Sequence, residues 1–325
     1  MPGFTTHYIF GMKAYNDMPF TPLKHTIAKY RWLYQLGLQG PDMFFYNIPI
    51  LRHRDYRNVG SYMHEHKVNA FFECCLHRIG TIRSRQQQEE AISYLAGFIN
   101  HYIADSICHP YVYGRIGYLV DAPTSMHHGM HAHLENELDA ILLWKYKKKK
   151  PSEFNQTATI CLNGQEIQFI SHFLASCINE TYYPITYRNN FQVTPAMVHR
   201  SIWALRFGCR TLSDKNGKKK FGIAQVESIF VNHPVASAKM VTDSVTDYRS
   251  SCNLNHEAWS NPWDPTRVST ASFVDLFHET LDKCSRVYAL LNSAVTDNMP
   301  LDKQDLSPLL AELGNESYHS GLPVD

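Results

Sequence analysis

The spacing of apolar and polar positions predicts a chain built almost entirely of α-helices. Apolar residues recur three and four positions apart over most of the sequence, which is typical of helices with one buried face. Proline sets two of the limits, because Pro22 lies in the first turn of one predicted helix and Pro110 is expected to end another. The predicted helices span residues 22–36, 58–78, 86–108, 127–147, 170–183, 195–212, 222–242 and 271–295.

The segments between these helices carry turn and loop signals. Gly40-Pro41 predicts a sharp turn, and residues 111–126 read as an aromatic loop that could lie over a site. A small β-hairpin is expected near 157–169, around Asn163-Gly164. The segment Asn253–Pro265 is rich in Trp and Pro and is expected to be an irregular loop.

The order of these elements favours one α-helical domain over residues 1–325, as a multi-helix bundle. Its first part, 1–145, holds the candidate chemistry, and 151–299 supplies supporting helices. The polar segment 300–325 is expected to be a loosely ordered tail.

Composition adds one unusual feature, which is the distribution of histidine. The chain has 18 histidines, and twelve of them precede residue 140. A net charge of +1 gives no reason to expect a stable nucleic-acid complex. The 8 cysteines form no CxxC pair, and we find neither a signal peptide nor an apolar run long enough to span a membrane. We therefore expect a cytoplasmic protein with no transmembrane segment.

Two helices carry histidine and carboxylate side chains on one stripe. His101, Asp105 and His109 lie four residues apart in a largely apolar helix. An ionised carboxylate buried between imidazoles needs compensation, which a divalent metal or a hydrogen-bonded trio would provide. His131 and Glu135 repeat this spacing and continue to Asp139, and the pair His133/Glu137 is the alternative. Two such stripes are typical of a metal site inside a helical bundle.

Three further residues are candidates on weaker grounds. His7 lies in an N-terminal segment and matters only if that segment enters the core. Asp42 follows the Gly-Pro turn, where it is either a helix cap or a ligand. His64 shares a helix face with Phe71, so we expect it to point inward.

These motifs together resemble the zinc-dependent phospholipase C family and the related single-strand nucleases of the same all-helical fold. The resemblance rests on TTHYIFG, GPDMFFY, SYMHEH, HYIADSICHP and HAHLENELD, in this order along the chain. It implies two to three zinc ions between the helices. By the resemblance, one zinc ion is held by Asp42, His64, His101 and Asp105. A second is held by His109, His131 and Glu135, and a third by His7 with Asp105 bridging.

The function that follows is a metal-dependent hydrolase of phosphodiesters, most similar to phospholipase C. Paired zinc ions would polarise a phosphoryl oxygen and supply hydroxide for attack on phosphorus. Asp42 is the best candidate for a general base or a carboxylate that orients water. The substrate is a phospholipid headgroup or a small phosphoester. The alternatives are a hydrolase of a soluble phosphoester or nucleotide, and a non-catalytic binding protein whose helices are held together by metal.

Overall fold

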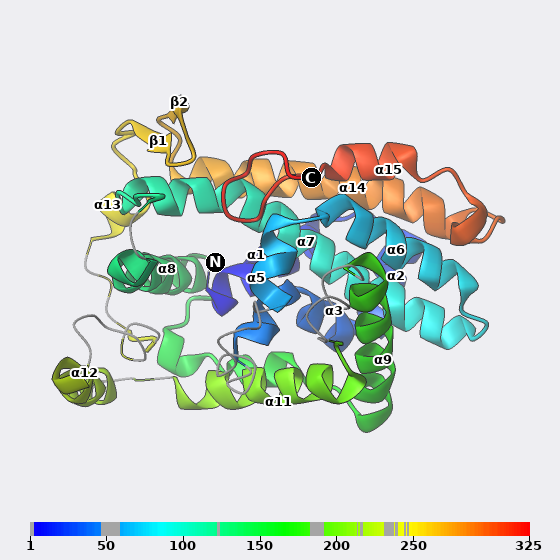
Figure 1. Ribbon diagram of the computed structural model, residues 1–325, viewed down its shortest axis with the longest axis horizontal. Helices are drawn as coiled ribbons and strands as arrows, with labels where there is room; N and C mark the ends of the chain where they lie inside the picture. Colours follow the sequence, from blue (N-terminus) through cyan, green and yellow to red (C-terminus); the bar gives the residue numbers. More distant parts are fainter. Residues whose placement is uncertain are drawn as a thin grey trace.

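The computed structural model shows a predominantly helical molecule, which confirms the all-α prediction (Figure 1). It describes residues 3–46, 59–121, 124–182, 192–212, 217–230 and 247–325, together with 214, 237, 240–243 and 245. The first half contains α1 (Phe4–Asp17), α2 (Pro22–Lys29), α3 (Arg31–Gly37), η1 (Gly40–Tyr46), α5 (Val59–Glu65), α6 (Val68–Thr81), α7 (Arg85–Arg115) and α8 (Thr124–Lys147). The second half contains η2 (Pro151–Glu153), η3 (Gln156–Thr159), α9 (Gly164–Thr181), α11 (Pro195–Thr211), α12 (Lys218–Phe230), α13 (Tyr248–Ser251), α14 (Phe273–Thr296), η5 (Leu301–Lys303) and α15 (Ser307–Leu313).

Helix α7 is the central element, and it contacts more of the other elements than any other described helix does. It runs beside α14 in Figure 1, and α1, α3 and η1 also contact it. The prediction that Pro110 ends this helix is wrong, because α7 continues to Arg115. Tyr111 and Val112 are fully buried, so packing keeps the chain helical although proline removes one backbone donor.

Two other predicted helices are each divided in the structure. The predicted helix 22–36 is split at Tyr30 into α2 and α3. The predicted helix 58–78 is split at Lys67, whose φ of 48° places it in the left-handed region. The first break lets α3 pack closely against α7, and the second separates the helix of His64 from α6.

The prediction of a hairpin near 157–169 is wrong. Asn163 is instead the N-cap of α9, where its side chain accepts a hydrogen bond from the Glu166 amide and the Glu166 side chain accepts one from the Asn163 amide. This capping box begins a helix at the Asn-Gly pair that we read as a turn. A small antiparallel sheet occurs elsewhere, between β1 (Trp259–Asn261) and β2 (Asp264–Ser269). These strands occupy part of the segment 253–265, which was expected to be irregular, and continue beyond it.

The carboxyl-terminal segment also differs from expectation. Residues 300–325 include η5 and α15, and Leu309, Leu313 and Tyr318 are buried. The segment is therefore packed rather than loosely ordered, because several of its few apolar residues lie in the core. The predicted helix 222–242 corresponds to α12 as far as Phe230, and 231–236, 238 and 239 lie outside the described residues. Its predicted end is wrong, because residues 240–242 are not helical and the Val241 backbone bonds to Leu212 and Asp214. Among the described helices, none is both long and apolar enough for a membrane span.

A close crossing of α3 and α7 provides a test of this packing. A Cβ atom added at Gly97 would overlap the carbonyl oxygen of Tyr34. We expect Gly97→Ala to lower the free energy of unfolding by about 1–3 kcal/mol, because the two helices must separate. Gly222→Ala is the matched control, since a Cβ there meets only open space and should stabilise α12 by about 0.5–1 kcal/mol. Urea unfolding of both variants measures the difference, and equal effects would contradict the proposed crossing.

Candidate metal centre

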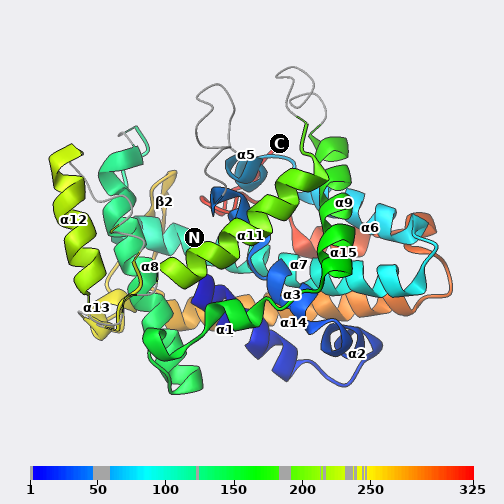
Figure 2. The same ribbon diagram turned by 90° about the horizontal axis from the view of Figure 1, so that it is seen from below.

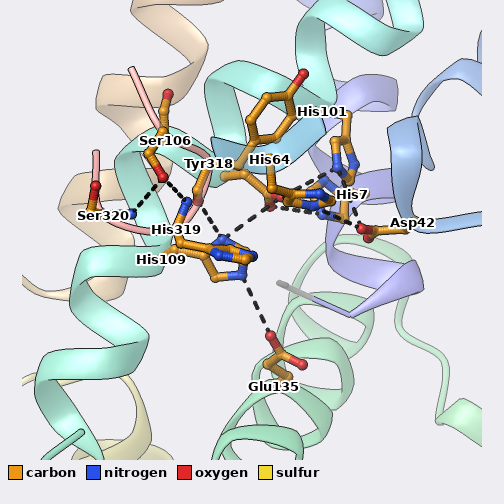
Figure 3. A network of polar contacts seen from close by, with 12 residues as sticks. His7, Asp42, His64, His101, Ser106, His109, Glu135, Tyr318, His319 and Ser320 are labelled. Carbon is orange, nitrogen blue, oxygen red and sulfur yellow. Dashed lines mark hydrogen bonds and ion pairs between the residues drawn. The ribbon is translucent and has the colours of Figure 1, made fainter. Parts of the chain in front are cut away.

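Five elements bring the predicted residues into one buried polar cluster. His7 comes from α1, Asp42 from η1 and His64 from α5. The stripe on α7 supplies His101, Asp105 and His109, and α8 supplies His131 and Glu135. Figure 3 shows His7, His64, His101 and Asp42 on one side of the network, while Glu135 approaches His109 from another helix.

The first group of possible ligands consists of Asp42, His64, His101 and Asp105. One nitrogen or carboxylate oxygen from each lies within 4.8 Å of the others. Nε2 of His64 is 3.2 Å from Oδ1 of Asp42, and Nε2 of His101 is 3.2 Å from Oδ2 of Asp105. All four side chains are buried.

The sharp turn at the start of η1 allows this approach. Gly40 has a φ of 47°, and a Cβ atom there would overlap the ring of His101. Glycine at this position therefore lets the chain turn and brings Asp42 against α7.

The second group consists of His109, His131 and Glu135. Their ligand atoms also lie within 4.8 Å of one another. Nε2 of His109 is 3.7 Å from Oε1 of Glu135, and Nε2 of His131 is 2.6 Å from the same oxygen. Asp105 lies between the groups, because its Oδ2 is also 3.7 Å from Nδ1 of His109, the ring nitrogen on the opposite side from the one that faces Glu135.

His7 lies beside the first group but does not belong to either set. Its Nε2 is 3.1 Å from Oδ1 of Asp105, the oxygen that faces away from His101. Its ring stacks on that of His101 with 4.0 Å between centroids. The N-terminal segment is therefore packed in the core as α1. This meets the condition under which the sequence analysis made His7 a candidate.

Backbone hydrogen bonds fix the orientation of three imidazoles. Nδ1 of His64 donates to the Gly60 carbonyl at 2.6 Å, and Nδ1 of His101 donates to the Leu38 carbonyl at 3.1 Å. Nδ1 of His109 donates to the Tyr318 carbonyl at 2.6 Å. A carbonyl oxygen can only accept, so in the neutral rings Nε2 carries the lone pair. This is the arrangement of metal-binding histidines, in which one nitrogen is anchored and the other is a ligand.

The electrostatics of the cluster also fit a cation. Burial would raise the pKa of the Asp105 carboxyl, but the His109, His101 and His7 imidazoles hold it well below its usual range. Burial lowers the pKa of His109 well below its usual range, so this ring is neutral at physiological pH. Burial would also lower the pKa of His101, but Asp105 and Asp42 outweigh it and raise the pKa.

Several buried atoms in the cluster make no hydrogen bond. They include both ring nitrogens of His7, Nε2 of His64, His101 and His109, Oδ1 of Asp42, and both carboxylate oxygens of Asp105. Leaving such groups unpaired in the interior is costly, and a divalent cation would satisfy them together. Imidazole nitrogens with carboxylate oxygens are a ligand set that zinc accepts. The residues present therefore fit zinc.

Asp139 has a structural position rather than a place among the possible ligands. Its carboxylate accepts hydrogen bonds from the amides of Thr5 at 3.1 Å and Thr6 at 2.7 Å. These amides belong to the first turn of α1, where a negative charge is favourable. Asp139 therefore joins α8 to α1 and holds His7 in place.

The pKa of Asp139 leads to a prediction about pH. Burial raises this pKa from 3.8 to about 6, although the Thr6 and Thr5 amides oppose the shift. A raised pKa in the folded state means stability that is present at low pH and is lost as pH rises through about 6. We compare zinc-free wild type with zinc-free Asp139→Asn. Between pH 5 and pH 7.5, the free energy of unfolding of the wild type should fall by about 1 kcal/mol more than that of the variant. Urea unfolding at the two pH values measures this, and a constant difference would contradict it.

The alternative pair His133/Glu137 points away from the cluster. The side chain of His133 is 54% exposed, and Glu137 accepts a hydrogen bond from the Ser251 hydroxyl. We expect His131→Ala to lower zinc affinity by more than about 100-fold, because loss of even an outer partner of a ligand typically costs 10- to 100-fold. His133→Ala is the matched control on the same helix and should keep the affinity of the wild type. Competitive titration with a zinc chelator measures both, and a larger loss for His133→Ala would favour the alternative pair.

Sequence reasoning missed the contribution of Tyr318 and His319. The Tyr318 amide donates to the His64 carbonyl at 2.9 Å, in addition to the bond between its carbonyl and His109. The ring of His319 stacks on that of His64 with 4.9 Å between centroids. No local pattern predicts these contacts, because Tyr318 acts through its backbone and both residues lie about 200 positions from α7 in the sequence.

The comparisons with known proteins agree with this geometry. A family model described as zinc dependent phospholipase C matches residues 6–186, which include every possible ligand described above. No curated protein and no solved structure gives a significant match. Since the matched region covers more than half of the 325 residues, the chain belongs to the zinc-dependent phospholipase C family.

Proposed function

We propose that this protein is a zinc-dependent phosphodiesterase that hydrolyses phospholipids in the manner of a phospholipase C. The observation that carries the proposal is the pair of neighbouring ligand groups with Asp105 between them. Family membership supports a metal-dependent hydrolase. Paired zinc ions, when bound, neutralise charge on a phosphoryl group and make water a nucleophile at neutral pH.

The two ligand groups differ in their access to solvent. The side chains of His101 and Asp105 are fully buried, whereas those of His131 and Glu135 are each 13% exposed. We therefore expect the phosphoester to approach from the side of α8. The first group, being more deeply buried, would hold its ligands rigidly in a medium that strengthens electrostatic interactions.

Asp42 is the proposed general base or water-orienting residue. One of its oxygens, Oδ1, faces Nε2 of His64 at 3.2 Å. A carboxylate has two oxygens, so Asp42 can bind a cation through one and accept a hydrogen bond from the attacking water through the other. Phe45 lies next to this position, with its ring centroid 5.4 Å from that of His64, and would contact the group attached to phosphorus.

The first test is the zinc content of protein purified without chelators. We expect two to three zinc ions per chain and hydrolysis of a soluble phosphodiester, bis(p-nitrophenyl) phosphate, that is lost with a chelator. A folded protein that neither contains nor takes up zinc would overturn the proposal.

A substrate panel then separates the alternatives. Cleavage of a short-chain phosphatidylcholine in preference to p-nitrophenyl phosphate and oligonucleotides would support the phospholipase assignment. Preference for the soluble phosphoesters would favour the alternative function, a hydrolase of a soluble phosphoester or nucleotide. Full zinc occupancy with no hydrolysis at all would indicate a protein in which the metal only holds the helices together.

A further inference from the structure

Helix α11 presents an aromatic and basic outer face that nothing in the described structure covers. Its inner face is buried through Val198, Ile202 and Leu205. On the opposite side, Trp203 is 63% exposed and Phe207 is 54% exposed. Large aromatic side chains are rarely left this exposed on one stripe of a helix without a partner.

The two aromatic rings form a single exposed patch. They lie one turn apart and stack with 5.4 Å between centroids and 9° between ring planes. Arg200 and Arg210 are exposed on the same stripe, one on each side of the pair. The helix sequence contains a third arginine, Arg206, and no acidic residue.

The position of α11 makes this face available to a flat surface. The helix lies along the lower edge of the molecule in Figure 1 and faces the viewer in Figure 2. Beyond its carboxyl end, α12 begins with the exposed Lys218 and with Phe221, which is 65% exposed. The net charge of +1 for the whole chain thus conceals a strongly basic region.

We propose that the outer face of α11 is a docking surface for anionic membranes, and this proposal does not depend on the proposed function. Aromatic residues flanked by arginines are the features of helices that lie in the plane of a lipid interface. The rings would enter the headgroup region while the arginines bind anionic lipids. A single-stranded nucleic acid fits less well, because such ligands follow a basic groove and stack between aromatic rings. Here the two rings stack on each other.

Docking through α11 would also place the metal centre near the membrane. Helix α11 packs against η1, which carries Asp42. Packed helices lie about 8–10 Å apart, so the ligand group would lie roughly one helix layer from the lipid surface.

The test is co-sedimentation of the full-length, zinc-loaded protein with lipid vesicles. We expect binding to phosphatidylcholine vesicles that contain about one third phosphatidylserine, weaker binding to pure phosphatidylcholine, and a decrease with salt. Trp203→Ala/Phe207→Ala should weaken binding to the anionic vesicles by about tenfold or more. Arg200→Gln/Arg210→Gln should weaken it by about fivefold for each arginine.

Matched controls distinguish a loss of membrane binding from misfolding of the variants and from a loss of catalytic activity. Phe20→Ala removes an aromatic ring that is 99% exposed between α1 and α2, and should bind as the wild type does. Thermal melts should show that the α11 variants remain folded, and their hydrolysis of the soluble phosphodiester should be unchanged. Vesicle binding by a protein inactive on every phosphoester would refute the proposed function and leave this proposal standing.

Three results would overturn the membrane proposal. The first is a wild-type protein that binds neither kind of vesicle. The second is a Trp203→Ala/Phe207→Ala variant that binds as tightly as the wild type. The third is evidence that the outer face of α11 binds something else. Such evidence would be a dimer, or binding of an oligonucleotide, that the Trp203→Ala/Phe207→Ala substitution abolishes.

Discussion

Asp105→Asn is expected to remove zinc and to lower phosphodiesterase activity more than any other single substitution considered. Oδ1 of this carboxylate faces His7, and Oδ2 faces His101 and both ligand groups. An amide of the same size keeps the packing but removes the negative charge and one acceptor oxygen. Losing an outer partner of a ligand costs 10- to 100-fold in affinity, so losing a ligand itself should cost more than about 100-fold. Elemental analysis and hydrolysis of bis(p-nitrophenyl) phosphate measure the two effects.

Asp139→Asn is the matched control for this substitution. Asp139 is a buried carboxylate close to the centre, but its hydrogen-bond partners are the backbone amides of Thr5 and Thr6. We expect this variant to keep the zinc of the two ligand groups, neither of which contains His7, and most of its activity. Asp105→Asn protein that retains full zinc and full activity would refute the role assigned to Asp105 as a ligand between the groups.

The sequence predicts the metal centre well wherever its residues lie on one helix. A spacing of four residues places His101, Asp105 and His109 on one stripe regardless of what surrounds them. The same periodicity selects His131 and Glu135, although it cannot by itself exclude His133 and Glu137. The resemblance supplied the assignment of ligands between helices, and the structure brings those ligands together in the same two groups. Their roles, and the single domain and cytoplasmic location, stay predictions.

Local patterns fail where tertiary packing or backbone atoms decide the outcome. Pro110 ends an isolated helix, but in α7 the burial of its neighbours outweighs one missing hydrogen bond. Asn163-Gly164 has the residues of a hairpin turn, and the capping box with Glu166 instead begins a helix. The polar composition of 300–325 hides the few apolar residues that attach this segment to the core.

The carboxyl-terminal segment should therefore be required both for stability and for zinc binding. Deleting residues 315–325 removes the carbonyl that anchors His109, the amide that binds the His64 carbonyl, and the buried ring of Tyr318. We expect the zinc affinity to fall about 10- to 100-fold, because His109 loses the partner that fixes its ring. Loss of a large buried aromatic side chain should lower the free energy of unfolding by about 3–5 kcal/mol. Chelator titration and urea unfolding measure the two quantities separately.

Two point variants separate the contribution of the Tyr318 side chain from that of the backbone of this segment. They remain informative if the deletion variant fails to fold. Tyr318→Ala keeps the backbone hydrogen bonds, so it should lose stability while the affinity for zinc falls little. Gly321 has a φ of 61°, and a Cβ there would meet the carbonyl oxygen of Ser106 on α7. Gly321→Ala should therefore push the segment away from α7 and weaken zinc binding although every other side chain is retained. If Gly321→Ala binds zinc like the wild type and Tyr318→Ala does not, the side chain rather than the backbone of this segment supports the metal centre.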